Sequence, residues 1–65
     1  MATVEEYRGC SIKWLETGEQ NVALVQPLDG SEHWLPITAT VTEGMQVLKE
    51  RTRKRIDDWL TAKGS

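Results

Sequence analysis

A chain of 65 residues has room for one domain, and a monomer of this size buries only about 60% of its unfolded surface. The net charge of −2 argues against a surface dominated by phosphate-binding cations, and the single cysteine excludes an intrachain disulfide. One cysteine and one histidine also fall short of the ligand set of a structural zinc site. We therefore expect one domain over residues 1–65 without metal or cofactor, held together by tight packing or by self-association.

The sequence also limits where the protein resides. No apolar run reaches the length that spans a membrane, and we expect no membrane partner. The segment from Met1 to Arg8 is polar and lacks the apolar stretch of a signal peptide. An unpaired Cys10 suits a reducing compartment. These features together predict a cytoplasmic protein.

The first predicted element is a strand over residues 6–15, because apolar and polar side chains alternate there. Tyr7 falls on the opposite face from the better apolar row, and Gly9 indicates a bulge or a close backbone approach. The inner face is expected to carry Cys10, Ile12 and Trp14.

Two further strands are predicted, over residues 21–26 and 32–38. The first contains the apolar run from Val22 to Val25, which is typical of a central strand or of one covered on both faces. The Asp29-Gly30 pair between them is a strong hairpin signal. Pro36 cannot donate a ladder hydrogen bond, so the last strand is expected at an edge, or bulged at that point.

The segment from residue 42 to residue 62 changes to helical spacing. Thr40 and Glu43 have the spacing of a capping box, with Thr42 as a competing N-cap, and Gly64 is a candidate stop. One face of the helix collects the residues expected to lie on the sheet: Met45, Leu48, Thr52, Ile56, Trp59 and Leu60. The predicted fold is therefore α+β, a three-stranded antiparallel meander with one C-terminal helix packed on one face, in βββα order.

The most prominent charge feature is the basic run from Lys49 to Arg55. A helix places Arg51, Lys54 and Arg55 on one flank, which is a candidate contact for nucleic acid or for an acidic partner. Acidic neighbours four residues away favour the alternative that these cations form an ordinary solvated face.

Trp34 is the second candidate contact residue. An exposed indole on an edge strand is a natural anchor for a partner chain or a stacking platform for a base. In the opposite register Trp34 belongs to the core and His33 is exposed, and the pattern leaves both registers open.

No catalytic pattern emerges from the remaining chemistry-bearing residues. His33 has no partner pattern of a nucleophilic triad, and Cys10 lies in an apolar alternation typical of a buried thiol. Asp57 and Asp58 are adjacent, so a helix points them in different directions and they cannot act as a facing pair. We therefore predict no enzyme activity, no catalytic residue and no bound cofactor.

The order of the predicted elements resembles that of small bacterial βββα proteins. The strands and their Asp29-Gly30 turn come first, and a C-terminal helix follows that ends in the sequence from Ile56 to Leu60. With the segment from Tyr7 to Gly9 opening the first strand, the chain resembles the HicB-type antitoxin fold in this order. It lacks that family's Pro-x-Leu-Pro-Gly-type segment and a separate DNA-binding extension. The resemblance implies a strands-then-helix fold and transfers no functional residue.

The expected role is a small, non-catalytic cytosolic interaction or regulatory module whose partner is a protein, a second copy of the chain included. The alternative is a nucleic-acid-associated or antitoxin-like protein that uses the basic flank of the helix. Binding that weakens steeply with salt separates the alternative from the first expectation.

Overall fold

The computed structural model describes residues 3–64 as an antiparallel sheet of four strands followed by one helix. The strands are β1 (Thr3–Tyr7), β2 (Cys10–Glu16), β3 (Gln20–Pro27) and β4 (Ile37–Thr40), and the helix is α1 (Gly44–Lys63). The strand order is β1-β2-β3-β4, with every neighbouring pair antiparallel. The α+β class, the meander and the C-terminal helix are confirmed, but the sheet has four strands and not three.

The additional strand arises because the segment predicted as one strand over 6–15 folds back on itself. Arg8 and Gly9 form a two-residue turn with φ of 50° and 83°, and Tyr7 pairs with Cys10 across it. Positive φ at both central residues is the geometry of the favoured tight hairpin, and glycine adopts it without steric cost. The turn places Tyr7 on the same sheet face as Cys10, so the predicted orientation of Tyr7 was wrong.

The other boundaries shift for local reasons. β3 extends the predicted 21–26 by one residue at each end and lies between β2 and β4. The strand predicted over 32–38 forms only in part, as β4. The two strands β3 and β4 are not joined by the tight hairpin expected at Asp29-Gly30 but by the irregular segment 28–36, which begins with a turn at Leu28 and Asp29 and ends at Pro36. β4 is an edge strand, as predicted, but Pro36 lies before it and not within it.

The helix begins two residues later than predicted. Thr40 and Glu43 exchange the expected pair of bonds: the Thr40 N–H donates to Glu43 Oε1 at 3.0 Å and the Glu43 N–H donates to Thr40 Oγ1 at 3.1 Å. These bonds close the turn that precedes α1. Gly44 has a φ of 88°, which only glycine adopts readily, and the regular helix follows. Gly64 ends the helix by donating its N–H to the carbonyl of Leu60.

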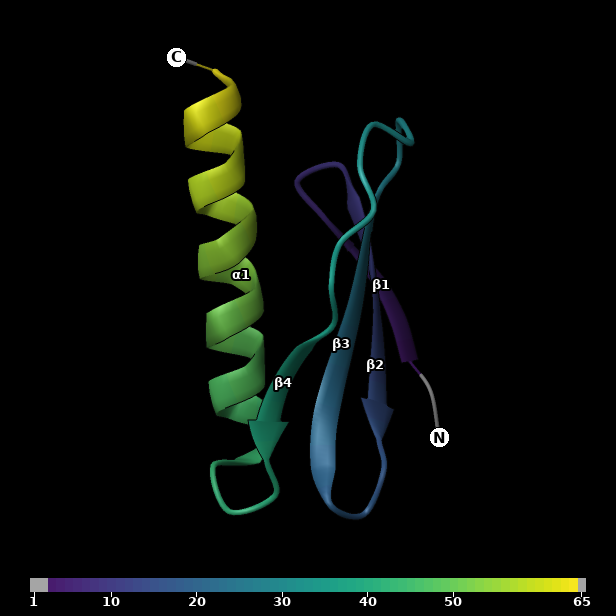
Figure 1. The fold of residues 1–65 in the computed structure, drawn as a ribbon, viewed down its shortest axis with the longest axis vertical. Helices are drawn as coiled ribbons and strands as arrows, with labels where there is room; N and C mark the ends of the chain where they lie inside the picture. Colours follow the sequence, from purple (N-terminus) through teal and green to yellow (C-terminus); the bar gives the residue numbers. More distant parts are fainter. Residues whose placement is uncertain (1–2, 65) are drawn as a thin grey trace.

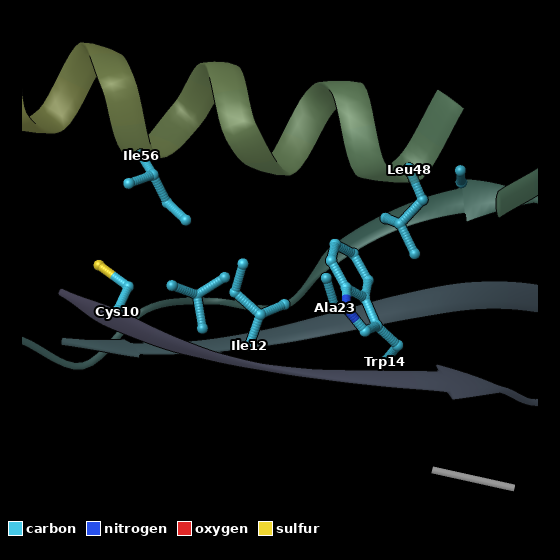
Figure 2. Packing of buried hydrophobic residues seen from close by; sticks show 8 residues of the cluster. Cys10, Ile12, Trp14, Ala23, Leu48 and Ile56 are labelled. Atoms are coloured by element: carbon cyan, nitrogen blue, oxygen red, sulfur yellow. The ribbon is translucent and has the colours of Figure 1, made fainter. Parts of the chain in front are cut away.

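The helix lies along one face of the sheet, nearest to β4 and β3, with β1 on the far side (Figure 1). Figure 2 shows Leu48 above Trp14 and Ala23, and Ile56 above Cys10. The predicted inner face of β2 is confirmed, since its apolar side chains are buried: Cys10, Ile12 and Trp14. On the predicted helix stripe Leu48, Thr52 and Ile56 are buried, and Met45, Trp59 and Leu60 are half-buried around them.

Two properties of this fold bear on function. Within residues 3–64, no helix combines the length and the apolar character needed to cross a bilayer. The helix covers one sheet face only, so the opposite face has no second layer in the described part of the chain.

Candidate interaction surfaces

The predicted basic flank of the helix is divided by the contacts of its members. Arg51 forms an ion pair with Glu43 and donates from Nη1 to the carbonyl of Thr38 at 3.1 Å. Hydrogen bonds from the Thr40 N–H and then from Arg51 hold the pKa of Glu43 below its ordinary value. Arg51 therefore fastens the helix to β4 and to the turn before it.

Arg55 and Trp34 lie together in an aromatic cluster. The guanidinium of Arg55 lies 4.6 Å from the centre of the Trp34 ring, a distance typical of cation–π contact. Trp34 meets Trp59 edge to face, with ring centres 5.5 Å apart and an interplanar angle of 79°. Lys63 lies 4.8 Å from the centre of the Trp59 ring and forms an ion pair with Asp29 at 3.3 Å. The structure thus joins two of the four predicted contact residues.

Neither strand register predicted for His33 and Trp34 is formed, because both residues lie in the irregular segment 28–36. His33 is exposed, whereas Trp34 is half-buried and packs against the edge of the core. The Nε1 atom of Trp34 is buried without a hydrogen-bond acceptor among the described residues. Trp34 anchors the irregular segment 28–36 to the helix, and Leu35 beside it is 87% exposed.

Lys54 is exposed on the outer side of the helix, and within residues 3–64 it has neither a hydrogen bond nor an ion pair. The acidic neighbours four residues from Lys54, Glu50 and Asp58, form no ion pair with it. Asp57, four residues after Arg53, pairs with Arg8 instead. The ion pairs of the described helix therefore reach to other elements and do not run along its surface.

A polar cluster that sequence reasoning missed connects the first hairpin to the helix. Arg8 Nη1 donates to Asp57 Oδ1 at 2.8 Å, and the Tyr7 hydroxyl donates to the same oxygen at 3.0 Å. The Arg8 bond lowers the pKa of Asp57, and the bond to Asp57 raises the pKa of Tyr7. The partners lie about fifty residues apart, so no local sequence signal could identify them.

A pocket of about 280 Å³ opens between β1, β2 and the start of the helix. Glu5 accepts a 2.6 Å hydrogen bond from Trp14 Nε1 at its wall. Glu16 also lines it, with no hydrogen bond or ion pair among residues 3–64. The remaining lining residues are Thr3, Met45 and Lys49. Three separate elements supply these residues, so the pocket was not visible in the sequence.

The sheet face opposite the helix carries an apolar patch, which we call the outer patch and which consists of Val4, Leu15, Val22 and Leu24. Val4 is 62% exposed and Leu24 is 38% exposed. Lys13 lies between these two in the strand register, since it pairs with both. Glu6 is the other charged residue of this face in the described strands, and the uncharged polar positions are Ser11, Gln20, Gln26, Thr38 and Thr40.

The described residues offer little for catalysis or metal binding. Cys10 is fully buried, and this burial raises the pKa of its thiol, which opposes a nucleophilic role. No group of three or more His, Cys, Asp or Glu side chains between Thr3 and Gly64 is placed to hold a metal ion.

Comparison with known proteins returned no protein-family model, no curated protein and no solved structure that matches this chain.

Proposed function

We propose that this chain is a small, non-catalytic cytosolic interaction module that assembles with a second copy of itself through the outer patch. The supporting observation is the exposure of Val4 and Leu24 beside Leu15 and Val22 on a sheet face without a covering layer. An antiparallel sheet that faces water usually alternates to polar side chains on that side. Here that side of the two central strands carries three apolar residues, of which Leu24 is exposed, Leu15 is half-buried and Val22 is buried.

The charge pattern selects a second copy as the occupant. In the described strands the face has one cation, Lys13, and one anion, Glu6, and the other polar strand positions around the patch are uncharged. Each face has no net charge, so two copies of it do not repel each other. A nucleic acid, by contrast, needs a cationic surface. A chain of 65 residues also gains from the added burial, because its own core is thin.

The test is the mass of the particle in solution, measured by size-exclusion chromatography with light scattering over a range of concentrations. The wild type is expected at twice the 7.4 kDa chain mass at high concentration, and Leu24→Glu is expected at the single-chain mass. Leu35→Glu is the matched control, because Leu35 is more exposed than Leu24 and lies outside the patch. A wild type that stays monomeric at every concentration contradicts the proposal.

A second candidate function keeps the nucleic-acid or antitoxin-like alternative. It is supported by the unpaired Lys54 and by Arg55 stacked over the Trp34 ring, since a guanidinium beside an indole can stack on a base. Arg51 contributes less charge to such a surface because Glu43 neutralises it. For this candidate we expect the protein to bind single-stranded nucleic acid with an affinity that falls steeply as salt is added. The double variant Lys54→Glu with Arg55→Glu is expected to lose this binding, and Lys13→Glu is expected to retain it.

A further inference from the structure

We propose that β1 and the adjoining pocket form a docking site for an extended, basic segment of a partner protein. This inference rests on the proposed function as an interaction module and adds the place and the chemistry of a second partner. The segment is inferred to add to the sheet as a strand antiparallel to β1, with an arginine or lysine side chain entering the pocket.

The backbone of β1 is free to pair along one edge in the described chain. This strand pairs with β2 on one side and has no strand neighbour on the other in the described chain. Alternate residues of such an edge direct their N–H and C=O groups away from the sheet, where an added strand can pair with them. Residues 3–7 contain no proline, and the register with β2 runs through them without a bulge. The helix lies nearest to β3 and β4 and leaves this edge uncovered (Figure 1).

The charge of the β1 edge is negative, and this favours a basic partner segment. Glu5 lies on the helix side of β1 and Glu6 lies on the outer side, so both faces of an added strand meet a carboxylate. A second copy of β1 paired antiparallel about Glu5 would place the two Glu5 carboxylates opposite each other, which is destabilising. A basic segment meets opposite charge on both faces and is therefore favoured.

The pocket beside β1 has the size and the lining to hold one long cationic side chain. Its volume of about 280 Å³ accommodates one long side chain. Trp14 and Met45 offer apolar wall for the aliphatic stem of an arginine or lysine, and Glu5 and Glu16 offer carboxylates to its charged end. Among the described residues of the lining, Lys49 is the one cation against the two carboxylates of Glu5 and Glu16, so these residues carry a net charge of about −1.

The register of β1 specifies a probe. An added strand that runs antiparallel to β1 faces its residues in the order from Tyr7 to Thr3. Its two cations face Glu6 and Glu5, and an apolar residue faces Val4. Polar residues at its two ends face Tyr7 and Thr3. The acetylated and amidated pentapeptide Thr-Lys-Arg-Val-Thr has this pattern. The matched acidic peptide Thr-Glu-Glu-Val-Thr has the same apolar and β-branched positions with the charges reversed.

The experiment is a titration of the isotope-labelled protein with each peptide, followed by its amide and indole N–H resonances. The basic peptide is expected to shift the amides of residues 3–7 and the indole N–H of Trp14, which donates to Glu5. Glu16→Gln is expected to raise the dissociation constant of the basic peptide about threefold, because losing one partly exposed ion pair weakens binding by about that factor. Glu50→Gln, which removes a carboxylate from the outer side of the helix, is expected to leave it unchanged.

Three results overturn the inference: equal binding of the acidic peptide, shifts confined to other elements, or no shift at all. The titration is repeated on Leu24→Glu to separate this site from the outer patch. Peptide binding by a monomeric variant supports the edge site independently of self-association. A wild type that dimerises but ignores the peptide refutes the edge site and leaves the proposed function standing.

Discussion

The hydroxyl of Tyr7 donates a 3.0 Å hydrogen bond to Oδ1 of Asp57 and so connects the first strand to the middle of the C-terminal helix. Arg8 donates to the same oxygen at 2.8 Å from the turn that follows. The helix makes most of its contacts with β3 and β4, so this polar cluster is a specific link between the helix and the far hairpin. The carboxylate of Asp57 therefore adds a polar link to the pairing of β2 with β3, which also holds the first hairpin.

The first prediction concerns the phenol of Tyr7. The hydrogen bond to Asp57 raises the pKa of Tyr7 above its ordinary value of 10.0, so the folded state holds this proton more tightly than the unfolded state does. The resulting stabilisation is complete below pH 10 and is lost as the pH rises through the folded-state pKa. Absorbance titration is expected to show Asp57→Asn lowering the pKa of Tyr7 toward 10.0. An unchanged titration in Asp57→Asn, or an equal change in Asp58→Asn, contradicts the assignment.

The second prediction is a loss of stability in acid. Hydrogen bonds from Ser31, and then from Lys63, lower the pKa of Asp29 from 3.8 to about 2, and the pKa values of Glu43 and Asp57 are also lowered. Lowered folded-state values mean that the stabilisation is present above the unfolded-state pKa and disappears as the pH falls through the folded-state pKa. The free energy of unfolding in urea is expected to fall between pH 4.5 and about pH 2.

The matched test of that acid sensitivity combines Asp29→Asn, Glu43→Gln and Asp57→Asn. This triple variant is expected to be less stable at neutral pH and to lose less stability in acid than the wild type. Glu19→Gln, in the turn between β2 and β3, is expected to keep the wild-type slope. A wild-type stability that stays constant across the acidic range refutes the prediction.

The third prediction concerns Gly44 at the start of the helix. Replacing glycine by alanine normally stabilises a helix by about 1 kcal/mol. Gly44 has a φ of 88°, which costs a residue with a side chain about 1–2 kcal/mol, so Gly44→Ala is expected to destabilise the fold. Gln46→Ala, exposed two residues later, is the control and is expected to change stability by less than about 0.5 kcal/mol. Chemical denaturation of both variants measures the difference, and a more stable Gly44→Ala contradicts the structure.

The fourth prediction uses Thr52, a fully buried polar residue in the apolar face of the helix. Its hydroxyl donates to the carbonyl of Leu48 at 2.8 Å, one turn earlier, and meets no other partner among residues 3–64. Valine has nearly the same shape, so Thr52→Val is expected to keep or raise stability by up to about 1 kcal/mol. Ile56→Ala, one turn further on, is expected to cost about 2–5 kcal/mol and to unfold much of the population. Thermal denaturation followed by circular dichroism distinguishes the two, and a large loss in Thr52→Val shows that the hydroxyl has a structural role.

The elements whose signal is local could be predicted from the sequence. The alternation of Cys10, Ile12 and Trp14 predicted the inner face of β2, and the helical spacing of Leu48, Thr52 and Ile56 predicted the side of the helix that is buried. Both patterns depend on which side chains leave water, and this requirement acts residue by residue along one element. The reciprocal bonds of Thr40 and Glu43 were predictable for the same reason, because their spacing is three residues.

The first hairpin could not be predicted from alternation. A turn of two residues, Arg8 and Gly9, leaves the apparent period of two intact on either side, and arginine is an uncommon residue at positive φ. The contact of Arg8 with Asp57 supports that conformation, and it depends on a residue 49 positions away. β4 was misplaced because Trp34 and Leu35 look like strand residues, while the structure uses Trp34 to fasten an irregular segment.

The same distinction between local signals and long-range contacts applies to the candidate sites. The sequence identified Trp34, Arg51, Lys54 and Arg55 as chemistry-bearing residues, but it could not assign the ionic partner of Arg51 or the stacking partner of Arg55. The pocket lined by Glu5, Glu16 and Met45 depends on how β1 folds beside β2, which the three-strand prediction did not contain. Residue types are visible in a sequence, whereas their neighbours are set by topology.

The edge-to-face contact of Trp34 and Trp59 gives the protein an internal optical reporter. Two indoles with centres 5.5 Å apart are close enough for their electronic transitions to couple, and we expect a paired positive and negative band in circular dichroism. One ring belongs to the irregular segment 28–36 and the other to the helix, so the band pair exists only while that segment is attached. Detachment of the segment can therefore be followed spectroscopically without a label, even under conditions in which the helix and the sheet remain folded.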